Sequence, residues 1–80
     1  MKNKKSIEAQ VIERVHNIFK SEELEITLES SNIDTPGWDS LANLEIISSI
    51  ESLIERQLSL DEIIDIVCVQ DLVEIVRKHI

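Results

Sequence analysis

Apolar residues recur every three or four positions in the first part of the chain, which is the spacing of one face of an α-helix. Ile7, Val11, Val15 and Ile18 follow this spacing, and polar residues fill most of the positions between them. Such a stripe is typical of a helix that buries one face against the rest of a domain. The pattern therefore predicts an amphipathic helix over residues 6–20.

A second helical pattern covers residues 40–56. Its apolar face consists of Ile46, Ile47, Ile50, Leu53 and Ile54. The opposite face carries Glu45, Ser48, Ser52 and Glu55, with Glu51 beside them. Leu41 projects onto this polar face, and Leu44 lies on its border. Two interpretations of Leu41 stay open, a docking contact for a partner or a single exposed leucine of the kind common in proteins.

The segment between these helices, residues 21–39, lacks a helical period and is long for so small a domain. Alternation at Leu24, Ile26 and Leu28 resembles a strand, but the chain offers no second strand to pair with it. We therefore expect a loop. Its apolar residues, Ile33 included, should pin it across the ends of the helices.

The C-terminal part predicts a short third helix over residues 61–66 and a last helix from residue 69 or 70 to 78. Apolar residues surround the short helix on almost all sides, so we expect it to be squeezed between the larger elements. Residues 1–80 thus form one all-α domain, a four-helix bundle with three longer helices, a short third helix and a long first loop.

The chain is strongly acidic, with 16 acidic and 8 basic residues and a formal net charge of −8. This charge argues against binding to nucleic acids or anionic membranes and favours partners with basic surfaces, although an acidic surface also keeps a small protein soluble. The single Cys68 excludes an internal disulfide, and no Cys/His cluster offers a metal site. With no membrane-spanning run and no signal peptide, we expect a cytoplasmic monomer.

The most informative residues lie where the second helix begins. Pro36 and Gly37 are turn residues, and Asp39 is a good N-cap. Ser40 then falls in the first helical turn, beside backbone N–H groups without helical acceptors and at the positive end of the helix dipole. A phosphate ester on its hydroxyl would be stabilised there. Ser40 is therefore predicted to be a modification site.

The motif Asp39-Ser40-Leu41 resembles the signature of the acyl carrier protein family, which stands at the start of the second helix in that family. Other positions fit the family's pattern as well: Ile26, Thr27, Glu45, Glu51, Ile66, Val69 and Gln70. The likeness spans nearly the whole chain, although only about a dozen positions are specific.

The resemblance implies that a phosphopantetheinyl transferase attaches 4′-phosphopantetheine from coenzyme A to Ser40, with Asp39 flanking the attachment site. The arm's thiol would carry acyl or aminoacyl groups as thioesters between acyl-transferring, ligase or synthase enzymes in fatty acid, polyketide or other specialised biosynthesis. The protein itself would not be an enzyme. The residues expected to meet the basic docking surfaces of these partners are Leu41, Leu44, Glu45, Ser48, Glu51 and Glu55.

Several positions depart from the pattern of fatty-acid carriers. Trp38 replaces a small residue before the motif, Ala42 replaces an acidic one, and Ser48 replaces a large apolar one. These features look more like stand-alone carriers of dedicated pathways. Two interpretations of Trp38 stay open, an aromatic plug that holds the loop on the bundle, which we favour, and a contact with the substrate. The alternative function is a non-enzymatic helical adaptor, in which Asp39 and Ser40 only cap a helix and the acidic face binds one basic partner.

Overall fold

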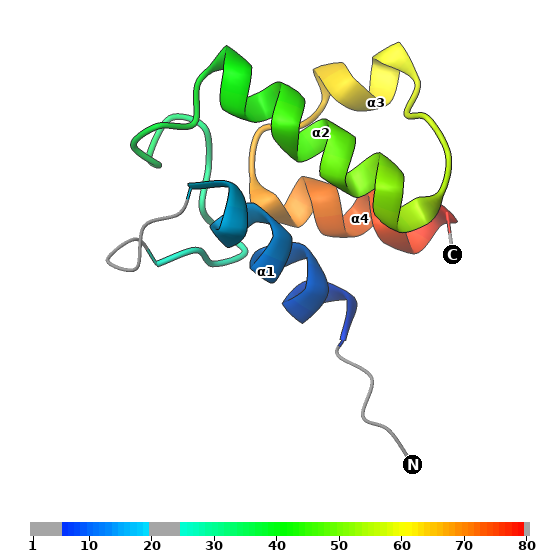
Figure 1. Cartoon of the computed structure of the whole chain (residues 1–80), viewed down its shortest axis with the longest axis horizontal. Helices are drawn as coiled ribbons and strands as arrows, with labels where there is room; N and C mark the ends of the chain where they lie inside the picture. The colour runs from blue at the N-terminus through cyan, green and yellow to red at the C-terminus, as the bar shows by residue number, and fades with distance from the viewer. Residues whose placement is uncertain (1–5, 20–24, 80) are drawn as a thin grey trace.

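The computed structural model describes residues 6–19 and 25–79, and these residues form four α-helices and no strand. The helices are α1 (Ile7–Phe19), α2 (Ser40–Ile54), α3 (Leu60–Ile64) and α4 (Val69–His79) (Figure 1). The prediction of a small all-α fold with a short third helix is thus confirmed. Lys20, the predicted end of the first helix, lies outside the described residues, as does Leu24 in the loop.

The three longer helices pack against one another around a core of aliphatic side chains, with α2 crossing in front of α4 and α1 beside both (Figure 1). The side chains that are almost completely buried are Val11, Val15, Ile46, Ile50, Val69, Leu72, Val73 and Val76. Burial of each such side chain contributes about 1.5–3 kcal/mol to folding. None of the described helices is both long and apolar enough to cross a membrane.

The prediction that the short helix is squeezed between larger elements is wrong. No residue of α3 is buried, and the side chains of Leu60 and Ile64 are 70% and 66% exposed. The physical reason is its length, because five residues make fewer than two turns and the three longer helices already close the core. Only Ile63 of α3 packs partly against this core, while Leu58 and Ile66 on either side of the helix are buried.

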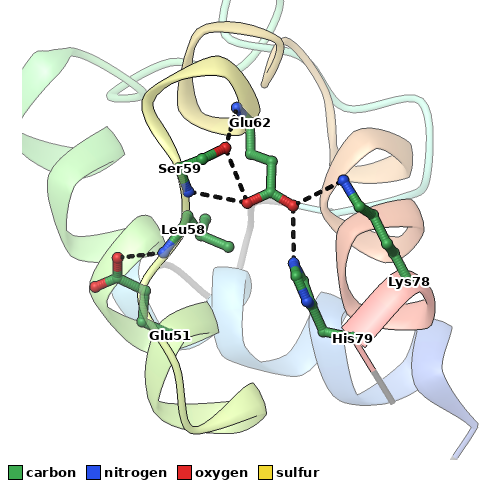
Figure 2. A network of polar contacts seen from close by, with 6 residues as sticks. All are labelled: Glu51, Leu58, Ser59, Glu62, Lys78 and His79. Carbon is green, nitrogen blue, oxygen red and sulfur yellow. Dashed lines mark hydrogen bonds and ion pairs between the residues drawn. The ribbon is translucent and has the colours of Figure 1, made fainter.

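Polar contacts attach α3 to the residue directly before it and to the end of α4 (Figure 2). The Ser59 hydroxyl accepts the Glu62 N–H at 3.1 Å, and the Glu62 carboxylate accepts the Ser59 N–H at 2.9 Å, which completes a capping box. The second carboxylate oxygen of Glu62 contacts His79 Nε2 at 2.8 Å and Lys78 Nζ at 3.2 Å, both at the end of α4. The Ser59 N–H first, and then His79 and Lys78, lower the pKa of Glu62 from 4.5 to about 2.

The loop before α2 is fixed by a few buried side chains and by its backbone. Ile26 is buried and Leu28 is half-buried, as predicted, but Ile33 is 86% exposed, so the prediction that it pins the loop is wrong. The Ser31 carbonyl accepts the Thr35 N–H at 2.9 Å and closes a turn over residues 31–35. The Thr35 side chain is buried in this turn.

Backbone hydrogen bonds also join the loop to the segment between α3 and α4. The N–H of Asn32 donates to the Val67 carbonyl at 3.0 Å, and the N–H of Val69 donates to the Ser30 carbonyl at 2.9 Å. These bonds form an isolated antiparallel bridge between Ser31 and Cys68. The loop that leads to Ser40 is therefore held by main-chain contacts that no apolar pattern reveals.

Candidate functional site

The predicted N-cap at Asp39 is confirmed. Its backbone is extended, and its Oδ1 accepts the N–H of Ala42 at 2.9 Å, so that α2 begins at Ser40. The N–H groups of Ser40 and Leu41 have no acceptor among the described residues. Ser40 is exposed. Its hydroxyl is thus accessible from solvent, next to free backbone donors and at the positive end of a fifteen-residue helix.

The turn before the cap depends on Gly37 and Trp38. Gly37 has φ of 91°, a conformation that favours glycine, and the Trp38 N–H closes the turn on the Thr35 carbonyl at 3.1 Å. The Trp38 side chain is only 6% exposed and its ring centroid lies 6.2 Å from that of Phe19 at the end of α1. This burial supports the interpretation of Trp38 as an aromatic plug between the loop and the bundle.

A hollow of about 330 Å³ lies directly beside Ser40. The residues that line it are Asn32, Ile33, Trp38, Asp39, Ser40 and Asn43. The Trp38 indole N–H donates to Asn43 Oδ1 at 3.0 Å and so fixes the orientation of that side-chain amide. The sequence reasoning did not find Asn32 or Asn43, because Asn in a loop or a first helical turn is ordinarily a turn or capping residue.

The residues predicted to bind partners lie on α2 or directly after it, and five of the six are exposed. Leu41 and Leu44 are 66% and 64% exposed, which confirms that both stand outside the core. The other exposed members are Glu45, Ser48 and Glu55. Because α2 contains no Lys or Arg, the electrostatic potential along its exposed side is set by carboxylates.

Glu51 differs from the rest of the predicted partner-binding set. It is half-buried, and its Oε2 accepts the N–H of Leu58 at 3.0 Å, which ties the segment after α2 back onto the helix (Figure 2). This carboxylate has a structural task. A substitution of Glu51 would therefore disturb the approach to α3 as well as any contact with a partner.

Three further apolar side chains on and just after α3 are exposed, although the sequence pattern predicted that this segment is buried. Leu60 and Ile64 belong to the helix, and Val67, which is 46% exposed, follows it. The one sequence feature that could have indicated this exposure is the apolar character of the segment on nearly all sides. The same feature is equally compatible with complete burial. Single exposed apolar residues are common, but several around one short helix are candidates for contact with a partner.

The reactive group that this site presents to solvent is the Ser40 hydroxyl. The lining of the hollow contains no His, Lys or Cys that could serve as a base for Ser40. No group of three or more His, Cys, Asp or Glu residues suited to a metal ion occurs in the described part of the chain. No model of a known protein family matches the chain.

Proposed function

We propose that the protein is an acyl carrier protein in which Ser40 carries 4′-phosphopantetheine. The observation that carries this proposal is the exposed Ser40 hydroxyl at the first residue of a capped helix, within the motif Asp39-Ser40-Leu41 and beside an open hollow. The residues present fit the group, since an anionic phosphodiester on Ser40 would meet two free backbone N–H donors and the positive helix end.

In the attachment step, the Ser40 Oγ forms a bond to the phosphorus atom next to the pantetheine part of coenzyme A. The phosphoanhydride bond of coenzyme A breaks, and adenosine 3′,5′-bisphosphate leaves with the electron pair of that bond. The hydroxyl proton of Ser40 passes to a base. The transferase has to supply this base, because the lining of the hollow offers only the Asp39 carboxylate, which already caps α2.

When bound, the arm supplies a terminal thiol that holds an acyl or aminoacyl group as a thioester. The chain's own contribution is to present the arm and to be recognised by the enzymes that load, modify or take the group. Glu45 and Glu55 supply exposed negative charge, and Leu41 and Leu44 supply apolar contacts. Such a surface favours fast and salt-sensitive encounters with basic partners, and a carrier must leave each partner quickly.

Labelling with coenzyme A tests the proposal. The purified protein is incubated with coenzyme A and a broad-specificity phosphopantetheinyl transferase, and its intact mass is measured. The expected result is the mass of one phosphopantetheine on the wild-type chain and none on the Ser40→Ala variant. A wild-type chain that gains no mass would instead favour the alternative, a helical adaptor whose acidic face binds one basic partner.

A further inference from the structure

Ile33 is the most exposed of the large apolar side chains in the described part of the chain, and it stands at the edge of the hollow beside Ser40. Its exposed fraction is 86%, although the turn that carries it is well fixed by hydrogen bonds to Ser31. An apolar group that covers this exposed side chain would remove apolar surface from water, which lowers the free energy.

Asn43 lines the same hollow, and its side-chain amide is held in one orientation. Because its Oδ1 accepts the Trp38 indole N–H at 3.0 Å, its Nδ2 is held in a fixed direction, and this amide nitrogen has no acceptor among the described residues. Trp38 itself is held by burial against Phe19. The donor is therefore preorganised and loses little freedom when it binds an acceptor.

We propose that this hollow binds the part of the pantetheine arm nearest to the phosphate, an inference that rests on the proposed function. That part of the arm carries two geminal methyl groups, a hydroxyl and an amide. The methyl groups would cover Ile33, and the Nδ2 of Asn43 would donate to a hydroxyl or carbonyl oxygen of the arm. Asn32, which also lines the hollow, would exchange hydrogen bonds with the amide of the arm.

The arm is the occupant that the geometry favours, because its point of attachment is itself part of the lining. A group tethered to Ser40 meets the hollow at an effective concentration on the order of millimolar, so a weak site is enough to hold it. Bound in this way, the arm would leave Ser40 in a preferred direction, toward the loop.

The experiment uses the full chain, isotopically labelled and converted to the phosphopantetheinylated form, with attachment confirmed by intact mass. Nuclear Overhauser effects are then measured between the geminal methyl protons of the arm and the methyl groups of Ile33. The side-chain amide signals of Asn32 and Asn43 are compared before and after attachment. The expected result is contact with Ile33 and a shift of both amide signals. Fluorescence of Trp38, the one tryptophan in the sequence, should change on attachment.

Two variants distinguish binding of the arm in the hollow from mere closeness of the arm to Ser40. Ile33→Ser removes the apolar rim without touching the core and should reduce the shifts of the Asn32 and Asn43 amide signals on attachment. Ile33→Leu, the matched control, keeps an exposed apolar side chain at the same position and should preserve these shifts and the contact with the arm. An attached arm with no contact to Ile33 and no shift of the Asn32 amide signal overturns the inference and leaves the proposed function standing. A chain that gains no mass overturns both.

Discussion

The carboxylate of Asp39 accepts the backbone N–H of Ala42 at 2.9 Å, and this bond fixes the residue at which α2 begins. It satisfies one donor of the first turn and leaves the N–H groups of Ser40 and Leu41 without an acceptor among the described residues. The cap therefore defines both the start of the helix and the position of the Ser40 hydroxyl on it.

Removal of this cap should destabilise the fold. Asp39→Ala is expected to lower the free energy of unfolding by about 1 kcal/mol, because the Ala42 N–H loses its acceptor. Asp39→Asn, which keeps an oxygen at the same place, should retain most of that stability. Urea unfolding followed by circular dichroism measures both. If the two variants lost the same amount, the charge of Asp39 rather than its hydrogen bond would be responsible.

The residue directly after α2 has a strained backbone, and its replacement should stabilise the protein. Glu55 has φ of 60° and ψ of 39°, a left-handed conformation that costs a residue with a β-carbon roughly 1–2 kcal/mol. Glu55→Gly is therefore expected to raise the free energy of unfolding by about 0.5–1 kcal/mol. Glu45→Gly is the matched control within the helix and should lower it by about 1 kcal/mol. Destabilisation by Glu55→Gly in the same urea titration would contradict the left-handed conformation.

The Glu62 carboxylate should make the stability depend on acid pH. Its pKa is about 2 in the folded protein against an ordinary value of 4.5, so the unfolded chain takes up the proton first as the pH falls. The stability that Glu62 contributes is fully present above the unfolded pKa and is lost progressively as the pH falls from 4.5 toward about 2.

Unfolding free energies of the wild type and of Glu62→Gln, measured from pH 2 to neutral pH, check this expectation. The difference between the two proteins should shrink through that acid window, because both then lack the charged carboxylate that accepts from Ser59, His79 and Lys78. Glu45→Gln removes one carboxylate elsewhere and controls for net charge. A constant difference across the pH range would show that the capping box and the contacts with α4 do not depend on ionised Glu62.

Reversal of one exposed charge on α2 should slow the transferase. Glu45→Lys is expected to lower the association rate with a basic transferase several-fold at low salt, and the loss should fade as salt shortens the screening length to about 10 Å at 0.1 M. Glu74→Lys makes the same charge change on α4, where Glu74 is also exposed, and should have the smaller effect. Stopped-flow kinetics provide the rates. Equal losses in the two variants would point to net charge rather than to a docking surface on α2.

Helical periodicity was enough to predict the three longer helices and their buried faces. Val11 and Val15, chosen from spacing alone, are both completely buried, and the cap at Asp39 was readable from its residue type. The end of α2 was placed two residues too late. The helix stops at Ile54 because Glu55 turns left-handed, and no Gly or Asn marks that position in the sequence.

The burial of apolar residues outside the long helices could not be predicted in the same way. Ile33 and Trp38 lie five positions apart in one loop, yet Ile33 is 86% exposed and Trp38 only 6%. Their difference comes from the position of Phe19 and from main-chain bonds between the loop and the segment before α4. Contacts between segments that are distant in the sequence determine this difference in burial, and they cannot be predicted from the local sequence. The hollow beside Ser40 arises from the same contacts.

Localisation of the modified residue tests the central claim most directly. After incubation with coenzyme A and the transferase, the protein is digested and the phosphopantetheinylated peptide is sequenced by tandem mass spectrometry. Ser52→Ala serves as the control, since Ser52 is exposed on the same helix and lies outside the predicted partner-binding set. The account predicts that the group sits on Ser40, that Ser52→Ala is modified fully and that Ser40→Ala is not modified. A wild-type chain without the group, or a group that persists in Ser40→Ala, would contradict it.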